Sequence, residues 1–267
     1  MMKLINDLWL KRRDIVSDGF DESLEYISKI IPLKIHKIPT GTKCWTWIVP
    51  EKWTVSSAFI EDLDGKRMLN LKDHPLHIVS YSLPIDKIVS KEELFQHLHT
   101  NPERPDAVPF EFKYYQKDWG FCIQDNKLKE FTKDKYKVFI DSKFEKGNLK
   151  VGDYTIKGKT DKIIILAAHL CHPGQANDDL AGVSVLVALA KAMSKKNNYY
   201  TYKFLFVPET IGSIAYLSQN EDLISKIECG IFLEMLGSDD IYALQLTKQG
   251  DARIDRIARY VMKRELK

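Results

Sequence analysis

Three short apolar runs in this chain each end on a side chain that can bind a divalent cation. The runs are IIILAAH, FLFVPE and GIFLE, and they end on His169, Glu209 and Glu234. Each run is continuous and rich in Ile, Leu, Val and Phe, which is typical of a buried strand. A fourth candidate, Asp178, lies in the loop that leaves the first run. In open α/β sheets the ligand site lies beyond the carboxyl ends of the strands, so we expect these four side chains to converge.

The residue types at this place predict metal-assisted hydrolysis. His169 and Asp178 belong to one loop, and an imidazole with a carboxylate suits Zn²⁺, which binds nitrogen and oxygen ligands. Glu209 and Glu234 can add oxygen ligands or act as a base. Water bound to a metal has a strongly lowered pKa, and a nearby carboxylate can take its proton. Each residue also has a purely structural interpretation, in which Asp178 caps the following helix or His169 is a core histidine.

The elements that must position these residues alternate between strand and helix. Strands are predicted over 136–141 and 148–156, followed by the strand that ends on His169 and a helix over about 178–195. Residues 3–31 predict two helical segments. This order indicates an α/β fold with a mostly parallel, mixed sheet covered by helices.

A region of different character interrupts this pattern. It holds four of the five Trp residues and several short strand-like pieces, with Asp64-Gly65 as a hairpin turn between two of them. We interpret it as a small β-rich domain, inserted over residues 39–125. The main domain would then comprise residues 1–38 and 126–267.

Bulk composition argues against several classes of protein. The net charge of the 267 residues is +3, and Lys and Arg are spread along the chain, which argues against a nucleic-acid surface. The N-terminus lacks an apolar signal core, and no apolar run approaches the length of a membrane span. The four cysteines are widely spaced without a CxxC pair. We therefore expect a reduced cytoplasmic protein with no nucleic-acid or membrane partner.

Several motifs resemble those of known peptidases. AHLCHPGQANDDLAG (168–182), VPETIGS (207–213) and FLEMLGS (232–238) resemble the metal-site segments of co-catalytic zinc aminopeptidases, the group of leucyl aminopeptidases and glutamate carboxypeptidase. CWTWIVPEKW (44–53) and YYQKDWGFC (114–122) resemble a little-studied bacterial aminopeptidase-like family. That family joins the peptidase fold to a small inserted β domain and a C-terminal winged helix. The resemblance covers nearly the whole chain and implies a zinc exopeptidase-like (phosphorylase/hydrolase-like) fold.

The resemblance also implies a role for each candidate residue. His169 resembles the first zinc ligand, Asp178 the aspartate that bridges two metals, and Glu234 the carboxylate that completes the shell of the first metal. Glu209 falls in a segment where one glutamate is the general base and the next binds the second metal. We favour the base for Glu209. The implied activity is cleavage of an N-terminal peptide or related amide bond, with one or two Zn²⁺ ions.

This chain departs from the resembled pattern at three points. It has a single glutamate at Glu209, and Cys171 replaces the aspartate that orients the first histidine. Its last histidine is His172, whereas the resembled enzymes supply a further histidine ligand near their C-terminus. We expect a truncated or degenerate member, in which His172 could partly compensate for that ligand.

Two alternatives to an active aminopeptidase remain open. One is a weakened or inactive member that acts as a binding protein, and the other is an amidohydrolase acting on a carbohydrate-linked substrate. An incomplete sheet would expose an edge that a second copy could cover, as in a homodimer. Tyr114, Tyr115 and Trp119 could form the wall of a substrate pocket.

Overall fold

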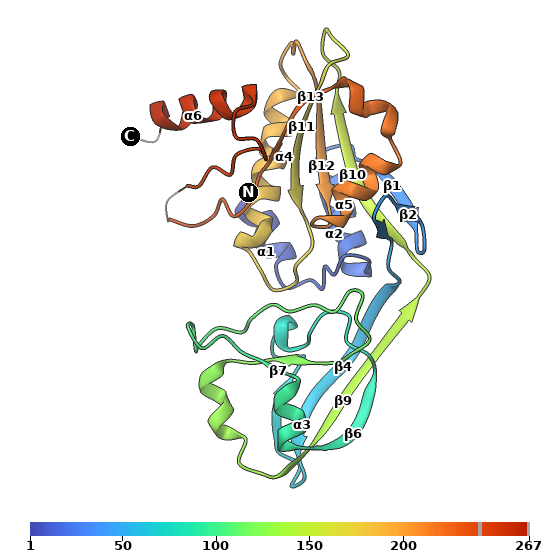
Figure 1. Ribbon diagram of the computed structural model, residues 1–267, viewed down its shortest axis with the longest axis vertical. Coiled ribbons are helices and arrows are strands. Elements are labelled where there is room, and N and C mark those ends of the chain that lie inside the picture. Colours follow the sequence, from blue (N-terminus) through green and yellow to red (C-terminus); the bar gives the residue numbers. More distant parts are fainter. Residues whose placement is uncertain (240–241, 266–267) are drawn as a thin grey trace.

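The computed structural model of this protein describes residues 1–239 and 242–265. Two sheets lie one above the other along the longest axis of the molecule (Figure 1). A five-stranded sheet with helices forms one part, and a four-stranded antiparallel sheet forms the other. No helix in these two described ranges is long and apolar enough to cross a membrane.

The five-stranded sheet is mixed. Its order is β1 (Lys34–Pro39), β10 (Asn148–Ile156), β12 (Thr201–Val207), β11 (Ile163–His169) and β13 (Ile227–Phe232). The pairings β12–β11 and β11–β13 are parallel, whereas β1–β10 and β10–β12 are antiparallel. The predicted mixed sheet is confirmed, and its parallel half consists of the three strands that carry the candidate ligands.

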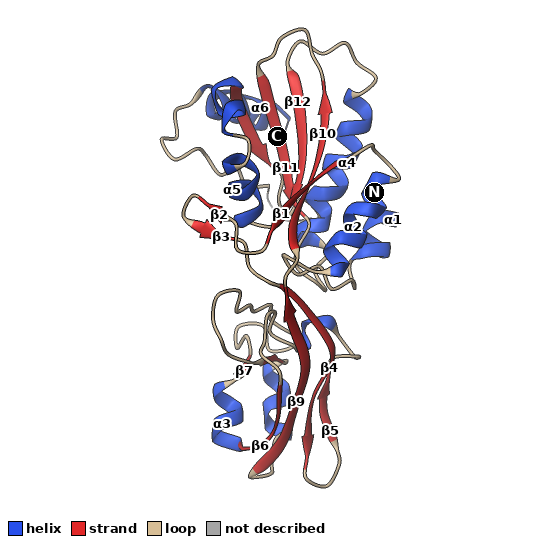
Figure 2. Cartoon of the chain, turned by 90° about the vertical axis from the view of Figure 1, so that its right-hand side faces the viewer, coloured by secondary structure: helices blue, strands red, loops and turns tan. Residues whose placement is uncertain are grey.

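Helices cover both faces of this sheet. Figure 2 shows α1, α2 and α4 on one side and α5 on the other. These helices are α1 (Met2–Leu8), α2 (Asp18–Ser28), α4 (Gly182–Met193) and α5 (Ile211–Ser218). The last helix of the chain is α6 (Arg253–Glu265). Helix α4 packs on β11 through buried apolar side chains that include Val183, Leu186 and Ala190. The central strands are therefore buried on both faces, as their continuous apolar sequences predict.

The four-stranded sheet has the order β5 (Arg67–Asn70), β4 (Lys52–Asp62), β9 (Lys135–Glu145) and β6 (Ile85–Ser90). Strand β9 lies within residues 126–267, the predicted main domain, but it pairs with β4 and β6 in this second sheet. The alternation of buried and exposed residues identifies β9 as a strand but does not show which sheet it joins.

Short elements complete the described fold. They are β2 (Lys43–Cys44), β3 (Trp47–Ile48), α3 (Lys91–Gln96), β7 (Leu98–His99), β8 (Phe121–Cys122), 3₁₀ turns at Pro75–His77, Asp125–Glu130 and Glu221–Lys226, and a π-helical turn at Asn177–Ala181. Two of the short strand-like pieces are less regular than strands: residues 46–49 contain only the two-residue β3, and residues 77–83 form only isolated bridges at Ile78 and Ser80.

The two sheets are joined by a buried cluster around Trp53. Its backbone N–H donates to the Val16 carbonyl (3.1 Å), and its indole N–H donates to the Ser82 carbonyl (3.0 Å). The indole stacks on the Tyr81 ring at 5.7 Å, and both side chains are 1% exposed. Because large buried aromatic rings pack in a fixed geometry, this cluster fixes the second sheet against the N-terminal helices.

Candidate metal centre

The ends of the three parallel strands converge, as the sequence predicted. His169 is the last residue of β11, Glu209 lies two residues beyond β12, and Glu234 lies two residues beyond β13. Asp178 lies in the π-helical turn that precedes α4. His169 Nε2 is 2.9 Å from Asp178 Oδ1 and 3.4 Å from Glu234 Oε1. The three ligands expected for zinc therefore lie together, with their candidate atoms within 4.8 Å of one another.

Glu209 is linked to this cluster by His172, whose side-chain orientation the sequence did not predict. His172 Nε2 is 3.0 Å from Glu209 Oε2, and His172 Nδ1 is 3.5 Å from Asp178 Oδ1. The side chain of His172 is 5% exposed, and its ring lies 4.8 Å from that of His169. Its backbone has φ = 76°, a left-handed conformation that is uncommon outside glycine. The sequence HLCH shows a second histidine, but the backbone conformation that directs it into the site is not visible in the sequence.

Several buried polar atoms of the cluster lack a hydrogen-bond partner within the described part of the chain. They are His169 Nε2, His172 Nδ1 and one carboxylate oxygen each of Asp178 and Asp179. His169 Nε2 and Asp178 Oδ1 are only 2.9 Å apart, yet their geometry is not that of a hydrogen bond. Leaving such atoms unsatisfied costs about 1–3 kcal/mol each, more for charged groups. A cation between the imidazole nitrogens and the carboxylates would satisfy them, so these residues fit a metal such as zinc.

The electrostatics of the cluster are strongly coupled. Burial by itself lowers the pKa of His169, but the Asp178 carboxylate and the Cys171 sulfur outweigh burial and raise that pKa to about 10. For His172, burial is outweighed by Cys171, Asp178 and Glu209, and the pKa rises to about 12. The same contacts hold the pKa of Asp178 well below its usual range, in spite of burial. Without a metal the imidazoles are therefore cations, and a metal must displace their protons to bind.

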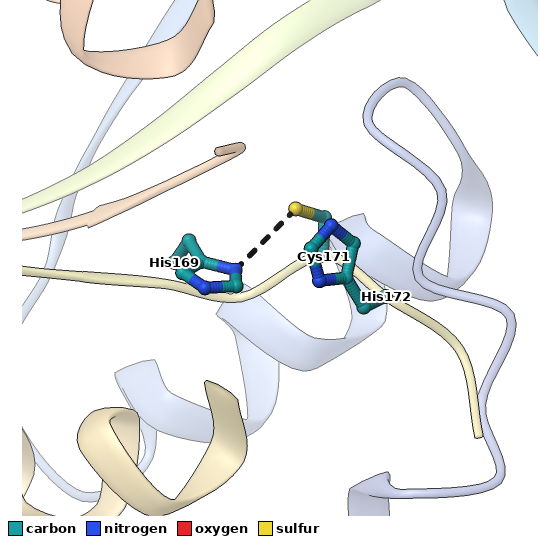
Figure 3. Close-up of side chains that lie close together, drawn as sticks. All are labelled: His169, Cys171 and His172. Atoms are coloured by element: carbon teal, nitrogen blue, oxygen red, sulfur yellow. Dashed lines mark hydrogen bonds between the residues drawn. The ribbon is translucent and has the colours of Figure 1, made fainter. Parts of the chain in front are cut away.

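Cys171 is fully buried next to the His169 ring, on the side of its Nδ1 atom. Figure 3 shows its sulfur directed toward the His169 ring, and Sγ lies 3.8 Å from Nδ1. The sulfur also accepts a hydrogen bond from the backbone N–H of Glu209 at 3.1 Å. Burial raises the pKa of the thiol, but His172 and His169 more than offset this and lower it to about 6. Cys171 thus contacts the ring nitrogen that faces away from Asp178, which is where an orienting group is needed.

Asp179 and Asn177 connect the π-helical turn to the segment after β13. Asp179 Oδ1 accepts hydrogen bonds from the backbone N–H groups of Gly182 (3.0 Å) and Met235 (3.1 Å). Asn177 Oδ1 accepts one from Gly237 N–H at 2.7 Å. Asp179, and not Asp178, caps the start of α4. These bonds hold the segment that carries Glu234 against the turn that carries Asp178.

Arg13 supports the site from the N-terminal side. Its guanidinium is completely buried and donates to the carbonyls of Leu170 (2.9 Å), His172 (2.6 Å) and Gln175 (3.2 Å). It also donates to the carbonyl of Leu8 at the end of α1. Burial lowers the pKa of Arg13 to about 10, so the side chain stays charged at neutral pH. One buried cation therefore fixes the whole loop that presents His172.

Solved structures with this fold include zinc aminopeptidases. A zinc aminopeptidase from Bacillus subtilis has a TM-score of 0.67 over 98% of this chain and 76% of its own, at 13% identity. A crystal structure of a presumed peptidase from Clostridium acetobutylicum has a TM-score of 0.92 at 40% identity, over 97% of this chain and 62% of its own. The architecture is therefore that of the zinc aminopeptidase fold.

The chain belongs to the family described as a domain of unknown function (DUF4910), whose model matches residues 2–267. A curated relative in Clostridium acetobutylicum is 40% identical over 259 residues, which are 97% of this chain and 60% of that protein. It is named as a presumed polysaccharide biosynthesis protein with an aminopeptidase-like domain. The present chain thus spans about 60% of the length of this relative.

Proposed function

We propose that this protein is a metal-dependent hydrolase of the aminopeptidase type, which cleaves an amide bond next to a free amino group. The observation that carries the proposal is the group of His169, Asp178 and Glu234 at converging strand ends, with buried nitrogen and oxygen atoms that lack partners. These three residues would hold zinc, and His172 extends the donor set toward a second ion. Bound zinc would polarise the scissile carbonyl and lower the pKa of a water molecule.

The chain's own residues supply the proton transfer in this proposal. Contact with His172 lowers the pKa of Glu209, in opposition to burial, so Glu209 is a carboxylate at neutral pH and can accept a proton. Its side chain is 46% exposed, which leaves it open to water and substrate. His172 Nε2 lies 3.0 Å from Glu209 Oε2 and so holds this carboxylate beside the other site residues. Glu209 is the general base in this assignment.

The similar proteins support this reaction class. The Bacillus subtilis enzyme is named as a zinc aminopeptidase, and the protein from Clostridium acetobutylicum as a presumed peptidase. Because the curated relative is named for polysaccharide biosynthesis, an amide on a carbohydrate-linked substrate is the second candidate. The fold itself does not choose between them.

Metal content and turnover test the proposal together. Protein purified without chelator and dialysed against trace zinc is expected to hold one or two zinc ions per chain by elemental analysis. His169→Ala and Asp178→Ala should lose that zinc, whereas Glu209→Gln should keep it. Wild type should hydrolyse members of a panel of aminoacyl amides and glycosylamides, and Glu209→Gln should lower kcat about 10²–10⁴-fold.

Three results would separate the alternatives. No zinc in wild type would refute the metal centre. Zinc that persists in both ligand variants would show that it binds elsewhere. Zinc lost in the ligand variants, with no turnover of any amide, would favour a binding protein that keeps the metal site.

A further inference from the structure

A row of aromatic side chains from the second part of the fold leads to the candidate metal centre. The sequence FEFKY alternates aromatic and charged residues, and in extended backbone alternate residues share one face. Phe112 and Tyr114 stack with ring centroids 4.4 Å apart, and Phe110 lies 6.0 Å from Phe112. We call Phe110, Phe112 and Tyr114 the aromatic strip.

Backbone hydrogen bonds hold the aromatic strip in place. Ser80 N–H donates to the Glu111 carbonyl (2.9 Å), and Lys113 N–H donates to the Ser80 carbonyl (2.8 Å). The hydroxyl of Ser80 donates to the buried Asp14 in the N-terminal segment. At the far end Tyr114 packs edge-on against buried Tyr81, at 5.1 Å. The strip is therefore part of the rigid junction between the two sheets and not a free loop.

The near end of the strip contacts the metal centre directly. The Phe110 ring lies 4.6 Å from the ring of His172, which in turn contacts Glu209 and Asp178. The strip thus begins one side chain away from the proposed base. Phe110 and His172 are about 60 residues apart in sequence, and they meet because the second part of the fold packs against the first.

Exposure separates the strip from an ordinary core cluster. Phe112 is 50% exposed. The side chains of Glu209 and Glu234 are each 46% exposed. The two site histidines are nearly inaccessible, so solvent reaches the centre from the carboxylate side. The half-exposed Phe112 ring lies one aromatic side chain beyond Phe110 and is available to a ligand, and aromatic faces bind the flat or apolar faces of other rings.

We propose that the aromatic strip is a binding subsite for a ring next to the scissile amide, with Phe112 as its main contact. The ring is either an aromatic amino-acid side chain or a sugar, since both present an apolar face. The inference rests on the proposed function for the reaction that follows, but ring binding is measurable without turnover. Of the three residues expected to form a pocket wall, Tyr114 belongs to the strip. Tyr115 contacts Trp47 and the Ile48 carbonyl instead, and Trp119 stacks on His97.

Binding of small amides to matched variants tests the subsite. Phe112→Ala is compared with Tyr115→Ala, because Tyr115 is 52% exposed and its ring contacts Trp47 instead of the strip. The probes are phenylalaninamide, N-acetylglucosaminylamine and alaninamide, each titrated into zinc-loaded protein and followed by ligand-observed NMR. Circular dichroism of each variant establishes that it is folded.

The expected result is selective for rings. Phe112→Ala should weaken binding of at least one ring-bearing probe about 5–10-fold, the effect of one stacked pair, and leave alaninamide binding unchanged. Tyr115→Ala should change neither. The ring probe that responds identifies the ligand as aromatic or sugar.

Two outcomes would overturn the subsite. One is a wild type that binds ring-bearing probes no better than alaninamide, and the other is an equal loss in the two variants. Ring-selective binding without hydrolysis of any amide would keep the subsite and refute the proposed reaction, so the two failures are distinguishable.

Discussion

Replacing Asp153 with asparagine is expected to destabilise the five-stranded sheet. Asp153 on β10 is 5% exposed, and its Oδ2 accepts hydrogen bonds from Lys203 Nζ (2.7 Å) and Tyr216 OH (2.9 Å). His36 Nε2 lies 3.3 Å from the same oxygen, and Thr155 Oγ1 donates to the other at 2.9 Å. The carboxylate thus joins β1, β10, β12 and α5, the elements on the Glu209 side of the site.

The size of the effect follows from the charge that remains. The asparagine of Asp153→Asn would keep the shape of the side chain but leave the Lys203 ammonium, whose side chain is 10% exposed, without a counter-charge. Removing one partner of a buried ion pair costs about 3–5 kcal/mol. Lys203 keeps its 2.8 Å bond to Thr155, so we expect the lower end, about 3 kcal/mol. For a protein of this size that corresponds to a fall in Tm of roughly 6–12 °C.

The loss should depend on pH in a definite direction. Burial opposes ionisation of Asp153, but His36, Lys203 and Tyr216 together hold its pKa well below its usual range. A carboxyl with a depressed folded-state pKa contributes stability above its unfolded pKa, about 3.9, and loses it as pH falls through the folded value. The difference between wild type and Asp153→Asn should therefore be full above about pH 5 and shrink below about pH 4.

Urea unfolding followed by circular dichroism, at pH 7 and at pH 3.5, measures both quantities. Asp161→Asn is the control, because the Asp161 side chain is 75% exposed and 3.9 Å from Lys226, and such surface pairs contribute little. A cost of Asp153→Asn below about 1 kcal/mol at pH 7, or an equal cost at both pH values, would refute the role assigned to the buried carboxylate.

Three further predictions concern the supports of the metal centre. Arg13→Lys should lower the free energy of unfolding by about 2–4 kcal/mol, because an ammonium cannot reach all the carbonyls that the guanidinium joins, and urea unfolding would show it. Gly182→Ala should destabilise despite the helix preference for alanine, since the new Cβ would lie 2.4 Å from Asp179 Oδ1. Gly230→Ala, with 3.9 Å to its nearest neighbour, is the tolerated control, and equal Tm values for the two would contradict this packing. Zinc affinity should rise with pH, about tenfold per unit for each imidazole proton displaced, and a pH-independent Kd in metal titrations would exclude protonated site histidines.

The sequence predicted the strands of the site because the signal for each strand lies in a short run of consecutive residues. Buried parallel strands require continuous apolar runs, and a ligand at the end of such a run must lie at the edge of the sheet. His169, Asp178 and Glu234 meet in the structure for this reason. The helix before Pro32 and the hairpin turn at Asp64-Gly65 were equally local, and both are present.

The remaining features depend on contacts between distant segments, which periodicity does not encode. His172 enters the site because its backbone is left-handed and Arg13 holds its carbonyl 159 residues away in sequence. β9 joins the second sheet because β4 offers it a partner along most of its length. The aromatic alternation at 110–114 was visible in the sequence, but its meaning needed the position of His172.

These distant contacts also explain why the second sheet bears on function. The chain leaves the five-stranded sheet after β1 and returns to it at β10. The segment between these two strands therefore contributes no strand to the five-stranded sheet. Yet Ser80 and Trp53, both within that stretch, are bonded to the N-terminal segment that also carries Arg13. The same segment therefore fixes the loop of His172 on one side and the aromatic strip on the other. A substitution that removed the hydrogen bonds of Arg13 would disturb the metal centre and the proposed subsite together. A substitution of Phe112 would affect the subsite alone.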